Sequence, residues 1–130
     1  MLFRSHAAVQ YSYLQGKSIV PQHDDSGIRY TIDAIDSTAT TKPGTDDLIT
    51  VTYTEKILTA DTLITAVDTP TKIALKDQVT AWRLMLPKYV AKGTKITMYV
   101  PSGYAYGSFG KEGIPTNSNL EYVVTLIKIN

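Results

Sequence analysis

The chain has 130 residues, of which 43% are hydrophobic and 19% charged, so it can bury the core of one domain and is not a disordered tail. The absence of cysteine excludes disulfides, thiolate zinc sites and cysteine nucleophiles. A net charge of +1 argues against a nucleic-acid-binding protein, and no apolar run approaches the roughly 18 residues that a membrane helix needs.

The first 26 residues are the least regular part of the sequence. The opening segment, MLFRSHAAVQ, has no long apolar stretch and is therefore not an intact signal peptide. Residues 7–14 suggest either one short helix that ends at Gly16 or a mobile leader. We therefore predict a poorly defined leader over residues 1–26 and one folded domain over residues 27–130.

The remainder of the chain reads mainly as strands. Eighteen threonines and nine tyrosines favour β structure, and apolar and polar residues alternate in several segments. Loops are predicted at residues 36–47, 66–71 and 101–119. The predicted strands cover residues 28–33, 48–54, 55–65, 73–75, 93–100 and 120–129.

Residues 78–86 (QVTAWRLML) are the one convincing helix. Val79, Trp82 and Leu86 share one face of it. Asp77 is placed to cap the first turn, and Pro87 predicts that the helix ends near Leu86. Several antiparallel strands with one short helix predict an α+β fold, in which the helix packs on one face of a curved sheet.

The polar residues indicate no metal site, cofactor site or catalytic dyad. His6 and His23 are the only histidines, and their spacing from the acidic residues suggests no ligand set. The acid pairs at residues 24–25 and 46–47 fit turns. The glycines of residues 103–113 do not lie between a strand and a long helix, so a phosphate-binding loop is not expected.

Aromatic residues gather at defined places in the predicted fold. Trp82 lies on the helix, Tyr53 and Tyr122 point inward from strands, and Tyr104 and Tyr106 lie in a glycine-bounded loop. Two interpretations remain open: these side chains fill a small core, or they form an apolar pocket with a few hydroxyl groups.

Three ordered motifs extend this pattern: VTAW (79–82), KITMYVPSGYAYG (95–107) and GIPTNSNLEYVVTL (113–126). A fourth segment, VTYT (51–54), lies at the expected distance upstream. Together they resemble the FKBP-type peptidyl-prolyl cis-trans isomerases, the macrolide-binding immunophilins, over about residues 28–130.

The resemblance implies a five- or six-stranded antiparallel sheet wrapped around one short helix, with a pocket between them. It implies that Tyr53, Trp82 and Tyr106 are the catalytic side chains, with Trp82 as the pocket floor. Val79 would donate its backbone N–H to a substrate carbonyl. The substrate-binding residues that the resemblance implies are Val79, Ile114, Tyr122, Leu63 and Ile64.

Several positions depart from the family pattern. Glu55 stands where the family has glycine, Leu63 and Ile64 stand at its Phe-Asp pair, and Ala81 replaces the glycine before the tryptophan. Thr71 stands where the family has a flap phenylalanine. Loss of the aspartate at Ile64 predicts a drier pocket, and loss of the phenylalanine removes a wall. We therefore expect low but measurable isomerase activity and weak macrolide binding.

The resemblance thus predicts an isomerase of X-Pro bonds in polypeptides, a monomeric folding helper without cofactor. The alternatives are a non-catalytic peptide-binding or chaperone module, and a structural domain whose pocket is filled by its own side chains. The segments YSYL (11–14) and DDSGIRY (24–30) resemble leaders of bacterial cell-envelope members, which favours the envelope or periplasm.

Overall fold

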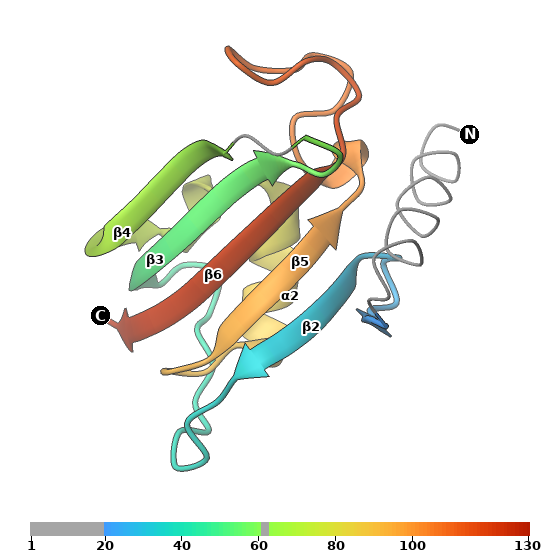
Figure 1. The fold of residues 1–130 in the computed structure, drawn as a ribbon. Helices are drawn as coiled ribbons and strands as arrows, with labels where there is room; N and C mark the ends of the chain where they lie inside the picture. Colours follow the sequence, from blue (N-terminus) through green and yellow to red (C-terminus); the bar gives the residue numbers. More distant parts are fainter. Residues whose placement is uncertain (1–19, 61–62) are drawn as a thin grey trace.

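The computed structural model describes residues 20–60 and 63–130, which form one antiparallel sheet and one α-helix (Figure 1). The segment predicted as a short helix or mobile leader, residues 7–14, lies outside the described residues. The helical segments are η1 (Leu75–Asp77), α2 (Thr80–Tyr89) and η2 (Ser102–Tyr104). The strands are β1 (Gln22–His23), β2 (Arg29–Ala34), β3 (Leu48–Ile57), β4 (Leu63–Ala74), β5 (Lys95–Val100) and β6 (Leu120–Ile129).

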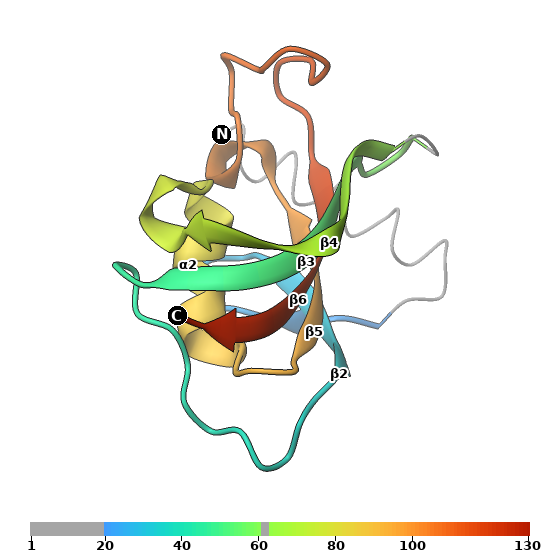
Figure 2. The ribbon, with the colours of Figure 1, turned by 90° about the vertical axis from the view of Figure 1, so that its left-hand side faces the viewer.

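The six strands of the described residues lie in the order β1-β2-β5-β6-β3-β4, and every neighbouring pair is antiparallel. The sheet curves, and α2 lies across its concave face (Figure 2). Strand twist and three bulged pairings give the sheet this curvature. The predicted α+β architecture, one short helix on a five- to six-stranded sheet, is confirmed.

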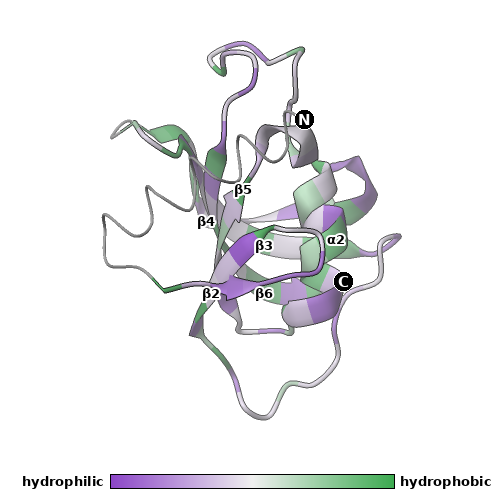
Figure 3. Cartoon of the chain, turned by 90° about the vertical axis from the view of Figure 1, so that its right-hand side faces the viewer, coloured by the Kyte–Doolittle hydropathy of each residue, from purple (hydrophilic) through white to green (hydrophobic). Residues whose placement is uncertain are grey.

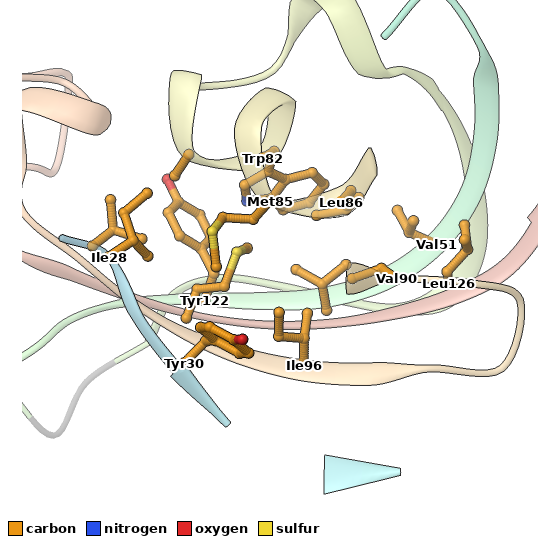
Figure 4. Close-up of a cluster of buried hydrophobic side chains, with 14 of the residues drawn as sticks. Ile28, Tyr30, Val51, Trp82, Met85, Leu86, Val90, Ile96, Tyr122 and Leu126 are labelled. Carbon is orange, nitrogen blue, oxygen red and sulfur yellow. The ribbon is translucent and has the colours of Figure 1, made fainter. Parts of the chain in front are cut away.

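The core lies between α2 and the concave face of the sheet. Figure 3 shows α2 with hydrophobic and hydrophilic bands, as expected for a helix that buries one face. Its residues Ala81, Trp82, Met85 and Leu86 are buried. Buried side chains from the strands and from Ile28, just before β2, pack against them: Ile28, Tyr30, Val51, Ile96, Tyr122 and Leu126. Figure 4 shows Val51 and Leu126 towards the Leu86 and Val90 end of this cluster.

The helix differs from its predicted limits at both ends. Val79 occupies the N-cap position and makes no side-chain cap, whereas the predicted cap, Asp77, ends η1. Pro87 lies inside the last turn instead of ending the helix at Leu86, and the N–H of Val90 still donates to the carbonyl of Leu86 at 3.1 Å. Because Leu86 and Val90 are fully buried, their packing outweighs the hydrogen bond that proline removes.

Strand β4 was predicted as a loop over residues 66–71 followed by a short strand, and this prediction is wrong. The strand is continuous from Leu63 to Ala74 although it contains Pro70. Pro70 is tolerated because β4 is an edge strand, and because the pairing moves from Val51–Thr71 to Tyr53–Val67, which leaves residues 68–70 in a bulge. Leu75, predicted to end the short strand, belongs to η1.

The loop of residues 101–119 projects beyond the sheet next to the start of α2 (Figure 1). In the part of the chain that the structure describes, no helix has both the length and the apolar character that crossing a bilayer requires.

Candidate active site

A cavity of about 350 Å³ opens where β3, β4 and β6 approach the start of α2 and the 101–119 loop. It has an aromatic floor, several hydroxyl groups and three charged side chains. The residues that line it are Tyr53, Glu55, Thr65, Asp77, Gln78, Val79, Trp82, Tyr106, Lys111 and Tyr122.

The floor of the cavity is Trp82, which is buried and faces the sheet as the helix pattern predicts. Tyr53 of β3 meets the indole edge-on, with ring centroids 5.0 Å apart and planes at 89°. Tyr122 of β6 does the same at 5.7 Å and 85°. Edge-to-face contacts of this kind add to the stabilisation from burial, so the three rings hold one another in place.

Glu55 of β3 is a buried carboxylate beside this floor, with 4% of its surface exposed. Its Oε2 accepts hydrogen bonds from the Tyr122 hydroxyl at 2.6 Å and from the Tyr106 hydroxyl at 3.2 Å. Its Oε1 accepts one from the Thr65 hydroxyl at 3.2 Å. Three hydroxyl groups from β4, the loop and β6 thus converge on one side chain, which compensates for its burial.

Lys111 lies at the exposed side of the cavity. Its Nζ is 3.4 Å from the Tyr106 hydroxyl oxygen and 5.0 Å from the centre of the Tyr106 ring. The hydrogen bond to Tyr106, together with the charge of Glu55, raises the pKa of the Lys111 ammonium. It therefore stays protonated well above neutral pH.

Two phenols of the cavity, those of Tyr53 and Tyr122, keep their protons. Burial raises the pKa of Tyr122, and the hydrogen bond to Glu55 raises it further. Burial and the charge of Glu55 also raise the pKa of Tyr53. At physiological pH these residues are therefore hydroxyl donors and not phenolates.

The structure brings together five of the residues named from the sequence: Tyr53, Val79, Trp82, Tyr106 and Tyr122 all line the cavity. The Tyr106 hydroxyl donates to Glu55 Oε2.

Three of the named residues lie outside the lining. Ile114 is buried in the core, because backbone hydrogen bonds pair it with Lys111 and turn its side chain inward. On β4, Leu63 is 48% exposed, and Ile64 packs partly buried against the core.

Two residues of the site, Glu55 and Lys111, were not predicted from the sequence. Glu55 was noted only as a departure from glycine, and the pocket was expected to be drier. A signal for Glu55 was present, because it continues the inward-facing alternation of Ile49, Val51 and Tyr53 along β3. Lys111 had no such signal, since its place depends on how the 101–119 loop folds back.

Comparisons with known proteins agree with this fold. The family model described as "FKBP-type peptidyl-prolyl cis-trans isomerase" matches residues 39–127. FK506-binding protein 1 of Saccharomyces cerevisiae is 34% identical over 95 residues, which cover 69% of this chain and 82% of the yeast protein. The FKBP-type isomerase FkpA of Aeromonas hydrophila is 28% identical over 107 residues, or 81% of this chain and 39% of that protein.

Solved structures share the fold of this chain. A peptidyl-prolyl cis-trans isomerase from Pseudomonas syringae superposes with a TM-score of 0.80 at 20% identity, covering 98% of this chain and 95% of the other. The chain spans less than half the length of the bacterial FkpA relatives that it matches. On the family match and the yeast relative together, the chain belongs to the FKBP-type peptidyl-prolyl cis-trans isomerase family, whose reaction is the isomerisation of X-Pro peptide bonds.

Proposed function

We propose that X-Pro bonds are isomerised in the Trp82 cavity, with the proline ring packed against the indole and between Tyr53 and Tyr106. The observation that carries this proposal is the aromatic floor, in which two tyrosine rings from the sheet meet the buried Trp82 edge-on. A floor of this kind offers a proline ring apolar contacts on several sides.

The reaction needs no nucleophile and no proton shuttle. Rotation about the X-Pro bond breaks amide resonance, and without catalysis it takes tens to hundreds of seconds. The twisted amide is less polar than the planar one, so an aromatic surface that excludes water favours it over the ground state. A rate gain of about a millionfold corresponds to roughly 8 kcal/mol of such preference.

The start of α2 supplies a backbone donor beside this floor. Val79 lines the cavity at the N-cap position, where the helix itself offers no acceptor for the backbone N–H. We assign this N–H to a carbonyl oxygen of the bound peptide, which would orient the proline over Trp82.

We further propose that the activity is low and that macrolides bind weakly. Thr71, at the position of the family's flap phenylalanine, is exposed and outside the cavity lining. A missing wall weakens binding of substrate and transition state together, which mainly raises KM. A large rigid ligand uses every wall, so macrolide affinity should fall more than turnover.

The expected substrates are proline-containing polypeptides, and we propose that residues 27–130 act on them as a monomer. The likeness of the leader to envelope members, together with the FkpA relatives, favours a place in a bacterial cell envelope.

The test is NMR exchange spectroscopy on an Ala-Leu-Pro-Phe peptide with wild type and Trp82→Ala. Trp82→Ala should lower kcat/KM at least tenfold, because it removes the floor. The void left by this truncation should lower the free energy of unfolding by about 3–5 kcal/mol, so circular dichroism must show that the variant is folded. Equal exchange rates for folded Trp82→Ala and wild type would favour the non-catalytic peptide-binding module.

A second pair of variants tests the backbone donor without opening the core. Val79 has φ −58°, and Gln78 before it is extended, so Val79→Pro fits this backbone while removing the N–H. Val79→Ala keeps the N–H and shortens the side chain. We expect Val79→Pro to lower kcat/KM several-fold more than Val79→Ala, and equal values would remove the N–H from the mechanism.

A further inference from the structure

The bond between Tyr106 and Glu55 decides which groups of the cavity can donate to a substrate. A phenol carries one proton, and that of Tyr106 is directed to Glu55 Oε2 at 3.2 Å. The hydroxyl protons of Tyr122 and Thr65 are directed to the same carboxylate. Three hydroxyl donors of the cavity are thus already used inside the protein.

Lys111 has N–H donors that its contact with Tyr106 does not use. An ammonium group carries three N–H donors, and the Tyr106 hydroxyl oxygen takes one of them at 3.4 Å. The side chain is exposed, and its Nζ is held 5.0 Å from the centre of the Tyr106 ring, over a wall of the cavity. The remaining N–H donors are available to a bound peptide.

Backbone hydrogen bonds of the 101–119 loop fix the position of Lys111. Its backbone N–H donates to the Ile114 carbonyl at 3.0 Å, and the Ile114 N–H donates back to its carbonyl at 2.8 Å. The Ile114 side chain is anchored in the core, so this short turn fixes where Lys111 starts.

We propose that Lys111 is a substrate-contacting residue that selects an acidic residue next to the proline, and that Glu55 is the positioning residue that gives it this role. Glu55 does so by accepting the hydrogen bond of the Tyr106 hydroxyl, which leaves the Tyr106 oxygen to accept from Lys111 Nζ and hold the ammonium at the cavity wall. This inference rests on the proposed isomerase pocket and adds a substrate class to it.

Asp77, the other exposed charged group of the lining, lies on η1 and not on the loop. Exchange of Asp77 therefore tests whether the selection comes from Lys111 alone.

The experiment measures three peptides of the form Ala-X-Pro-Phe, with X as Glu, Leu or Lys, by NMR exchange. An exposed ion pair of this kind changes kcat/KM by about 1.5- to 5-fold, so wild type should prefer the Glu peptide over the Leu peptide by such a factor. Lys111→Met should abolish this preference. Lys72→Met, an exposed lysine of β4 outside the cavity, and Asp77→Asn should keep the preference for Glu over Leu.

The role of Glu55 is tested by coupling. Glu55→Gln retains an oxygen that can accept from both tyrosines, so Lys111→Met should have its full effect in that background. Glu55→Leu with Tyr122→Phe removes the acceptor without leaving a buried hydroxyl unpaired, and it frees the Tyr106 proton. In that background the freed Tyr106 hydroxyl competes with Lys111 for the peptide, so the fold-change that Lys111→Met causes in the Glu-over-Leu ratio of kcat/KM should fall towards one.

Two results would overturn the inference. One is an unchanged Glu-over-Leu ratio in Lys111→Met while Trp82→Ala is inactive, which leaves the isomerase pocket standing. The other is a Glu-over-Leu preference that Tyr53→Phe abolishes, since Tyr53 carries the remaining hydroxyl of the floor. Peptide affinities from NMR titration give the same comparison independently of turnover, so the preference is measured even if the pocket only binds.

Discussion

At the scale of single residues, Asp24 is, like Glu55, a buried carboxylate that accepts several hydrogen bonds. It accepts hydrogen bonds from the Tyr89 hydroxyl at 2.5 Å and from Lys88 Nζ at 3.1 Å, both on α2, and from the backbone N–H of Ser26 at 3.0 Å. Burial opposes its ionisation, but these bonds together outweigh burial and hold the pKa of Asp24 well below its usual range. Asp24 therefore ties the segment before β2 to the end of α2.

Asp24→Asn should lower the free energy of unfolding by about 1.5–3 kcal/mol at pH 7, because hydrogen bonds to a charged group are lost. The folded pKa lies below the ordinary value of 3.8, so the stabilisation is complete above about pH 5 and is lost as pH falls towards the folded pKa. Urea unfolding should show the difference from wild type shrinking between pH 7 and pH 2.5. Asp46→Asn, at an exposed turn position, is the control and should leave stability nearly unchanged.

At the scale of elements, the 101–119 loop carries two of the residues that line the cavity, and specific bonds hold it. The Tyr104 hydroxyl donates to the Ser26 carbonyl at 2.9 Å, and the Asn117 N–H donates to the Gly107 carbonyl at 2.8 Å. Gly110 has φ +69°, and a Cβ there would lie 2.8 Å from the Ile114 carbonyl oxygen. The loop can therefore close around Lys111 only with glycine at this position.

Gly110→Ala should raise KM for a Leu-Pro peptide several-fold, because the clash with Ile114 displaces Lys111 and Tyr106. Gly113→Ala is a matched control: Gly113 has φ +82°, but nothing lies within 4 Å of its added Cβ. Both variants carry the cost of a left-handed alanine, about 1–2 kcal/mol, and only Gly110→Ala adds the clash. Equal KM values for the two would show that the loop geometry at Gly110 does not affect the site.

At the scale of the whole molecule, one core supports both stability and the site, because Trp82 belongs to the cavity floor and to the helix–sheet interface. Met85 is fully buried one turn further along α2 and does not line the cavity. Truncation of the Met85 side chain should therefore lower stability and leave the cavity lining unchanged.

Met85→Ala should lower the free energy of unfolding by about 2–5 kcal/mol, through lost burial and the cavity left behind. Leu48→Ala, at a position that is 45% exposed, should cost well under half as much. Chemical denaturation measures both, and kcat/KM per folded molecule should stay within a factor of about two in each. A Met85→Ala variant with full stability would contradict the single-core description.

The sequence alone predicted the elements in which local pattern and packing agree. Strand β6 was predicted over residues 120–129 and is observed there, because its alternation of buried and half-buried residues matches its central place in the sheet. Trp82 was predicted to face the sheet from a helical pattern, and it does. Short-range motifs were likewise sufficient to indicate the family.

Where local rules and tertiary contacts disagree, only the folded chain decided the outcome. Pro70 and Pro87 lie inside β4 and α2, because an edge position with a bulge and a buried helix face outweigh the local preference of proline.

The chemistry of the cavity has the same origin. Glu55 is a pocket carboxylate because hydroxyl groups distant in sequence, from Thr65, Tyr106 and Tyr122, converge on it. The sequence by itself determined the strand pattern, the helix face and the family, since these depend on residues close together in the chain. The tertiary structure decided which polar groups meet in the site, since hydrogen bonds between distant segments form only when the fold brings them within about 3 Å.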